Sequence, residues 1–370
     1  MEAAHAPSLR IRTTGAMLLM AATAATAFAA EPPIGNLNTV TVLSSTVPAN
    51  GDLNPYGVAR VPRTRGDLVE GRFLISNFNN STNAQGTGTT IVQIATDGTF
   101  SQFAQIDPTK VSCPGGIGLT TALVALRSGF VIVGSLPTVG GASSTAEAGC
   151  LIVLDSWGKV VETFSGHHIN GPWDMTAVDG GFLAALFVTN VLNGTVAANG
   201  DVVNGGTVIR LLLLTPDNGP PLLLDSTVIA TGFPERTDPV ALVIGPTGVA
   251  FNEDSGTLYV ADTLNNRIAA VPNALLRFIP SWQGITVSSG GELNGPLGLS
   301  ITPDHRLIAA NGDDGNLVEI DPFTHEQISE KLVDDSGGPP PGNGALFGLV
   351  AGADAVYFVD DATNTFNVLH

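Results

Sequence analysis

The segment from Gly245 to Ile268 constrains the fold of this 370-residue chain more than any other part of the sequence. It contains a turn, an apolar strand, a tight turn, a second apolar strand and a polar corner, spelled Gly-Pro-Thr-Gly-Val-Ala-Phe, Gly-Thr-Leu-Tyr-Val-Ala-Asp and Asn-Asn-Arg-Ile. Weaker copies recur along the chain, and the last three opening glycines, Gly248, Gly298 and Gly348, stand 50 residues apart. A repeat of this length, built from short strands and turns, is typical of a β-propeller.

Six copies of the opening motif are present, and short apolar runs follow each of them. The motifs are Asn54–Gly57, Gly115–Gly118, Gly171–Asp174, Gly245–Gly248, Gly295–Gly298 and Ala345–Gly348. The second apolar run of each copy is continuous rather than alternating, as expected for a strand that neighbouring blades cover on both faces. The sequence therefore predicts an all-β, six-bladed propeller, and the long interval between Asp174 and Gly248 leaves room for a seventh blade.

The sixth copy reaches the last residue, His370, with only three strands. The segment Leu37–Thr46 has the composition of a strand and directly precedes the first opening motif. We expect it to supply the outer strand of the last blade, because this closure joins the two ends of the chain and removes exposed strand edges.

The first 29 residues match a secretory signal peptide. Arg10 and Arg12 supply the positive region, Ala16–Ala25 is a short apolar core, and Ala27–Ala29 forms an A-x-A cleavage site. A retained N-terminal anchor helix is the alternative. We expect a secreted or periplasmic protein in which residues 30–370 form a single propeller domain.

The charge and the cysteines limit the partners and the compartment. A formal net charge of −18 disfavours nucleic acid and anionic membrane surfaces. No later apolar run has the length of a membrane span, and we expect a monomer. The two cysteines, Cys113 and Cys150, favour one disulfide in an exported chain. A reactive thiol is the alternative, but no motif such as C-x-x-C supports it.

The fourth copy resembles an NHL repeat, with Gly-Pro-x-Gly-Val-Ala, a G-x-L-Y-V-A-D strand and T-x-N-x-R-I in order. The resemblance implies an NHL-like propeller over the whole mature chain and leaves the function open. Some relatives of these propellers resemble lactonases with a metal held at the channel mouth by Glu, Asn and Asp. Others are lyases with a histidine-ligated metal, and many are non-enzymatic platforms for protein, sugar or nucleic acid.

Asp174 is the candidate catalytic residue, because it stands where other copies have the opening glycine and is expected near the channel mouth. A carboxylate there could bind a cation or act as a base, whereas the alternative is a simple turn residue. Asp262, beside Asn265 and Arg267, could also bind a ligand. The alternative is that these side chains only hold the turn together. Oxygen ligands of this kind would suit Ca²⁺ rather than zinc. The candidate binding residues, at motif starts or strand ends, are Asn54, Asp174, Asn190, Asp262, Asn311 and Asp360.

Taken together, the sequence favours an exported, non-catalytic binding or scaffold module for an unidentified protein or carbohydrate ligand. Such a module would use the channel mouth and three loops rich in Gly, Asn, Ser and Thr, namely Asn79–Gly88, Val139–Gly149 and Asn193–Gly205. The alternative is a metal-dependent, calcium-type lactonase or hydrolase, with its site at the channel mouth and Asp174 as ligand or base. No glutamate matches the one expected from such relatives, and the sequence does not decide whether the protein is an enzyme.

Overall fold

The computed structural model describes residue 1 and residues 34–370, and residues 34–370 make up the folded domain. The predicted signal peptide lies outside the described residues, apart from Met1. Within the described part of the chain, no helix combines the length and the apolar character that crossing a membrane requires.

Six sheets, antiparallel apart from one short parallel pair in blade 3, form the six predicted blades, each running from an inner to an outer strand. Blade 1 consists of β2 (Leu53–Arg60), β3 (Phe73–Asn79), β4 (Thr90–Ile94) and β5 (Phe100–Gln105). Blade 2 consists of β6 (Leu123–Ala125), β7 (Val131–Ser135), β8 (Cys150–Leu154) and β9 (Val160–Ser165). Blade 3 consists of β10 (Pro172–Asp179), β11 (Leu183–Asn190), β12 (Val203–Leu214) and β13 (Leu222–Asp238), joined by β14 (Leu242–Ile244) and β18 (Ser281–Trp282).

The other three blades have four strands each. They are β15 (Pro246–Asn252), β16 (Thr257–Asp262), β17 (Arg267–Val271) and β19 (Ile285–Ser289); β20 (Pro296–Ile301), β21 (Leu307–Asn311), β22 (Asn316–Ile320) and β23 (Gln327–Leu332); and β24 (Leu346–Ala351), β25 (Val356–Asp360), β26 (Thr365–Leu369) and β1 (Val40–Ser45). Short helices occupy the connections: η1 (Ile34–Asn36), η2 (Pro108–Lys110), η3 (Ser143–Thr145), α1 (Thr195–Ala198) and η4 (Thr263–Asn265). The long interval before Gly248 is used by the extended β12–β13 hairpin and by α1, so the propeller has six blades.

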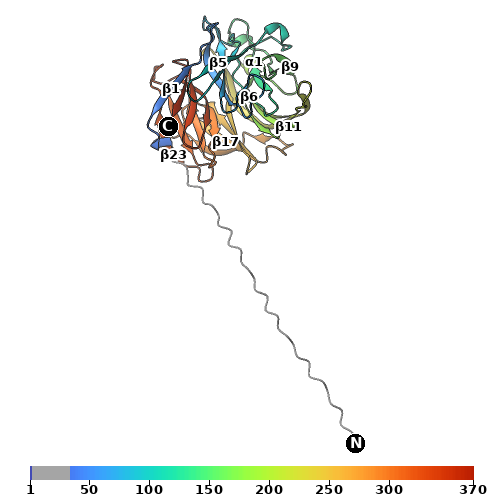
Figure 1. Ribbon diagram of the computed structural model, residues 1–370. Helices are drawn as coiled ribbons and strands as arrows, with labels where there is room; N and C mark the ends of the chain where they lie inside the picture. Colours follow the sequence, from blue (N-terminus) through green and yellow to red (C-terminus); the bar gives the residue numbers. More distant parts are fainter. Residues whose placement is uncertain (2–33) are drawn as a thin grey trace. The chain divides into compact units, whose positions relative to one another are not determined.

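The predicted closure of the last blade is confirmed. Strand β1 pairs antiparallel with β26, from Val40 opposite Leu369 to Ser45 opposite Thr365. Figure 1 shows β1, in blue, beside the red strands at the end of the chain. The edge of β26 is therefore covered by the start of the domain, which ties the first and last blades together.

Apolar contacts between neighbouring blades form the core and explain the continuous apolar runs. The cluster between blades 2 and 3, for example, joins Ile132 and Leu151 to Leu186 and Ile209, all without solvent exposure. All seven residues of β3 are buried. A strand with both faces covered has no polar face, and so the sequence of β3 does not alternate.

The opening glycines are required because adjacent inner strands approach each other too closely for a side chain. A Cβ on Gly298 would lie 2.1 Å from the carbonyl oxygen of Phe347, and one on Gly348 would lie 2.0 Å from that of Tyr56. The same contact recurs from Gly248 to Leu297 at 2.4 Å. Each of these glycines therefore faces the residue that precedes the opening position of the next blade.

Blade 2 departs from the predicted motif. A Cβ on Gly57 would lie 2.5 Å from the carbonyl oxygen of Thr121, which makes Ala122 the opening residue of blade 2. The inner strand β6 begins at Leu123, five residues after Gly118. The motif Gly115–Gly118 therefore belongs to the connection that leads into the blade, and the prediction that it opens the strand is wrong.

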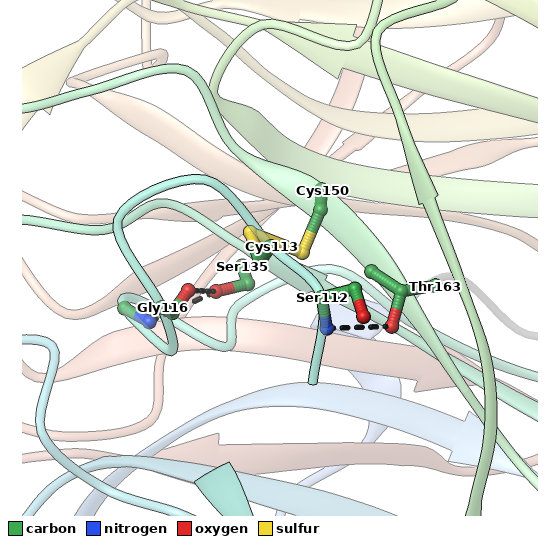
Figure 2. The surroundings of a disulfide bond; sticks show 7 residues. Ser112, Cys113, Gly116, Ser135, Cys150 and Thr163 are labelled. Carbon is green, nitrogen blue, oxygen red and sulfur yellow. Dashed lines mark hydrogen bonds between the residues drawn. A yellow bond between two sulfur atoms is a disulfide. The ribbon is translucent and has the colours of Figure 1, made fainter. Parts of the chain in front are cut away.

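The disulfide between Cys113 and Cys150 joins this same connection to strand β8, with a Cα–Cα distance of 5.5 Å (Figure 2). Two hydrogen bonds hold the connection on either side. The amide of Ser112 donates to Thr163 Oγ1 at 3.4 Å, and Ser135 Oγ donates to the carbonyl of Gly116 at 3.3 Å. The long segment before β6 is thus fastened to its own blade.

We predict that Gly298→Ala lowers the free energy of unfolding by about 3 kcal/mol, because the new methyl group would collide with a backbone carbonyl that cannot move away cheaply. Ala122→Gly is the matched control at the equivalent position of blade 2, where a Cβ is already accommodated; it should cost about 1 kcal/mol. Urea unfolding of both variants checks this. If both variants lost the same free energy of unfolding, the proposed close contact between adjacent inner strands would be contradicted.

We predict that Cys113→Ala/Cys150→Ala lowers the free energy of unfolding by about 4 kcal/mol, because the bridge closes a loop with a sequence separation of 37 residues. Thermal melts of this variant and of reduced wild-type protein should agree. A variant as stable as the oxidised protein would show that the bridge does not constrain the unfolded chain.

Candidate functional site

A cavity of about 250 Å³ runs along the inner strands of all six blades. Apolar side chains that line it include Val58, Leu123, Val249 and Leu299, although polar atoms supply the larger part of its surface. At one end it reaches the level of the opening residues, and at the other it reaches the exposed Arg60 at the end of β2. The cavity is therefore the central channel of the propeller, and it opens at the end marked by Arg60.

Asp174 is the one carboxylate among the residues that line this cavity. It follows Trp173 on β10 and occupies the position that glycine or alanine fills in the other five blades. Its Oδ1 accepts a hydrogen bond from the amide of Met175 at 2.8 Å. Burial raises the pKa of Asp174 to about 7, although backbone hydrogen bonds from Met175 and Val249 oppose the shift. The carboxyl is partly accessible, and a group with this pKa can take up and release a proton near neutral pH.

Aromatic side chains close the channel beside Asp174. Tyr56 stacks on Phe347, with ring centroids 5.0 Å apart, and meets Trp173 and Phe78 edge-on. The indole N–H of Trp173 donates to Tyr56 Oη at 2.7 Å. Burial, together with the charge of Asp174, raises the pKa of Tyr56 well above its usual value. Tyr56 therefore remains a neutral hydroxyl while Asp174 titrates.

Three inserted loops lie over this closed end. Gln85, in the loop of blade 1, donates its side-chain amide to the carbonyl of Val240. The loop of blade 2 contains η3, which contacts α1 in the loop of blade 3. Leu119, Leu192 and Leu242 complete the apolar cluster beneath them. The loops predicted as adaptable contact surfaces thus form a cover over an apolar plug.

A buried glutamate positions one of these loops. Glu235 is fully buried, and its Oε1 accepts hydrogen bonds from the amide of Asn193 at 2.7 Å and from Thr195 Oγ1 at 3.0 Å. Burial raises the pKa of Glu235 to about 7. It lies on β13, in contact with the first residue of α1, and is outside the set of residues that line the channel; its contacts indicate a structural role.

Two of the predicted binding residues hold the turns that lead into their blades. Asn190 Oδ1 accepts the amide of Asn170 at 2.7 Å, and Asn311 Oδ1 accepts the amide of Asn294 at 3.1 Å. Each acceptor ends the second strand of its blade, and each donor lies two residues before the first. This repeated bond explains why a polar residue follows an apolar strand.

Three further candidates make other local contacts. Asp262 pairs with Arg267 at 2.6 Å and accepts the side-chain amide of Asn265 at 3.0 Å. Asp360 Oδ1 accepts the amide of Thr363 at 3.0 Å. Asn54 reaches across the closure, where its side-chain amide donates to Asp361 at 2.9 Å. Burial raises the pKa of Asp361 to about 8.

Of the six predicted residues, Asp174 alone lines the channel, and the structure does not bring the other five to it. A binding role for those five stays a prediction. The sequence reasoning missed the aromatic plug and Arg60. A signal for the plug was present, since Tyr56, Trp173 and Phe347 each stand immediately before the opening position of a blade.

The residues around Asp174 do not form a metal centre. Over residues 34–370, no group of three or more His, Cys, Asp or Glu side chains is arranged to hold a metal ion. Calcium takes six to eight oxygen ligands, usually with several carboxylates. The positions equivalent to Asp174 are glycine or alanine, so the six opening residues contribute one carboxylate and do not fit this requirement.

Comparisons with solved structures identify the same architecture in enzymes. A gluconolactonase from Xanthomonas campestris superposes with a TM-score of 0.53 at 13% identity, over 89% of this chain and 88% of that chain. A virginiamycin B lyase from Staphylococcus aureus gives 0.50 at 15% identity, over 90% and 85%. A luciferin-regenerating enzyme gives 0.51 at 12% identity, over 90% and 95%. A search of curated protein sequences finds no match.

These neighbours contradict the prediction of a non-catalytic binding or scaffold module, because all three are described as enzymes. They favour the alternative, an enzymatic propeller. At these identities the similarity shows the fold alone, so a substrate and a mechanism have to be argued from the residues of this chain.

The NHL repeat family model matches residues 244–270, the segment that first indicated the fold. This match covers one repeat, and the six sheets around a central channel supply the remainder of the architecture. The chain is therefore a six-bladed β-propeller that contains an NHL repeat.

Proposed function

We propose that this protein is a hydrolase that cleaves a small ester or lactone inside the central channel, with Asp174 as general base and acid. The observation that carries the proposal is the position of Asp174, the one carboxylate among the residues that line the channel. At the equivalent positions of the other blades the chain has glycine or alanine. The gluconolactonase among the structural neighbours supports the choice of ester and lactone chemistry.

In the proposed reaction, the ionised carboxylate of Asp174 takes a proton from water as the water oxygen bonds to the carbonyl carbon of the substrate. The tetrahedral intermediate then breaks its bond to the leaving oxygen, which receives the proton from Asp174. A group with a pKa near 7 suits both steps at neutral pH. The hydroxyl of Tyr56 stays neutral over this pH range, so it adds no second charge beside Asp174.

Calcium has no role in this reaction scheme, because the ring around Asp174 offers a single carboxylate. The calcium prediction stays separately testable through the metal content of the purified protein. The proposed reaction should continue at an unchanged rate in the presence of a chelator.

We also propose that the protein is exported. The disulfide between Cys113 and Cys150 supports this proposal, because such bonds persist in oxidising compartments. The signal peptide that would direct export is a sequence prediction on residues outside the described part of the chain.

We predict that Asp174→Asn lowers kcat for ester hydrolysis by about 100-fold or more, since the amide cannot accept the proton from water. In the wild type, kcat/KM should rise with pH and level off above about 7, where the carboxyl is ionised. Asp179→Asn is the matched control on the same strand; its carboxylate accepts the amides of Arg127 and Gly181 and does not line the cavity.

Spectrophotometric assays with 4-nitrophenyl esters and with δ-lactones check this prediction. Full activity in Asp174→Asn, with activity present in the wild type, would remove Asp174 from the mechanism. Absence of hydrolysis across both classes of substrate would contradict the proposed reaction.

We also predict that the stability of the folded protein falls as the pH rises from about 4 to 7. Over this range the folded protein retains a proton on Asp174 that the unfolded chain has lost, because the folded pKa is about 7 and the ordinary value is 3.8. Asp174→Asn should therefore melt higher than the wild type at pH 8 and show a flatter dependence on pH. A dependence identical to that of the wild type would indicate an ordinary pKa for Asp174.

A further inference from the structure

Two charged side chains line the central channel, and they stand at opposite ends of it. Asp174 lies at the level of Gly57, its equivalent on β2, beside the aromatic plug. Arg60 lies three residues further along β2, at the open end. At the rise of an antiparallel strand, three residues span about 10 Å. A small molecule inside the channel can therefore contact both groups at once.

Arg60 is a cation with no carboxylate partner among residues 34–370. The ion pairs in this part of the chain involve other arginines and His305. Arg60 is exposed and is one of the residues that line the cavity, so its guanidinium can turn its planar set of N–H donors toward a molecule that enters. This geometry matches a carboxylate, which can accept two parallel hydrogen bonds.

The sequence around Arg60 is basic in a strongly acidic chain. The segment from Arg60 to Arg72 contains four arginines, which are these two together with Arg63 and Arg65, and two acidic residues. The chain as a whole has a formal net charge of −18. Arg60 thus lies in a segment where an anion would meet a more favourable local charge than over the acidic chain as a whole.

We propose that Arg60 binds the carboxylate of an anionic substrate and thereby determines which esters the channel accepts. This inference deepens the proposed function and rests on it. The substrate is a small monoanion with its carboxylate at Arg60 and its ester or lactone carbonyl at Asp174. The cavity volume of about 250 Å³ lies below the range typical of drug-sized ligands and limits the substrate to a small molecule. Val58 and Ala59, which line the cavity between Gly57 and Arg60 on β2, supply apolar contacts for a hydrocarbon spacer.

A kinetic experiment tests the specificity. The wild type is assayed with the mono-4-nitrophenyl esters of succinic, adipic and suberic acid and with neutral 4-nitrophenyl alkanoates of equal chain length. We expect higher kcat/KM for the anionic esters, greatest for the longer spacers. Arg60→Gln should reduce the ratio of anionic to neutral kcat/KM by about tenfold or more, mainly through KM, because a hydrogen bond to a charged group is lost. Arg63→Gln, which removes a neighbouring arginine that does not line the cavity, should leave the ratio unchanged.

A binding experiment separates this inference from the proposed reaction. Suberate should raise the melting temperature of the wild type and of Asp174→Asn, and Arg60→Gln should lose that shift while Arg63→Gln keeps it. If no ester is hydrolysed but suberate binds through Arg60, the reaction is wrong and the anion site stands. If suberate gives no shift, or an equal shift with Arg60→Gln, the anion site is overturned. An anionic-to-neutral ratio unchanged in Arg60→Gln overturns it as well.

Discussion

The close approach of the six inner strands is the constraint on which the rest of this propeller depends. At Gly248, Gly298 and Gly348 the carbonyl oxygen of the next blade occupies the space of a side chain. These contacts set the width of the channel, and they leave few positions where a functional side chain can stand. A carboxylate at one position of this ring is an exception that places chemistry at the centre of the fold. The burial that results from the same packing raises the pKa of Asp174.

One end of the channel is closed by the residues that stand immediately before the opening positions of the blades. Three aromatic side chains fill this end of the channel, those of Tyr56, Trp173 and Phe347, and the inserted loops cover them. A ligand therefore approaches from the opposite end, past Arg60. In the proposed reaction the two ends have different tasks, since the closed end holds the acid–base group and the open end selects what enters.

Much of the fold could be predicted from the sequence because its signals are local. Turn glycines, apolar runs and the unpaired strand before Asn54 gave strand limits close to those observed, including β8 (Cys150–Leu154) and β26 (Thr365–Leu369). The site was less predictable because it depends on contacts between blades. Within a single repeat, no pattern indicates that Ala122 rather than Gly118 opens blade 2. No pattern indicates either that Asn190 and Asn311 hold local turns.

The central claim is that Asp174 is an acid–base group within a ligand-accessible channel. An NMR titration of its ¹³C-labelled side-chain carboxyl, with Asp174→Asn used to assign the resonance, tests this claim most directly. The account predicts a midpoint near pH 7 that moves when a short alkanoate fills the channel. A midpoint near pH 4 that does not respond to such ligands would contradict it, because the carboxyl would then be an ordinary solvated aspartate.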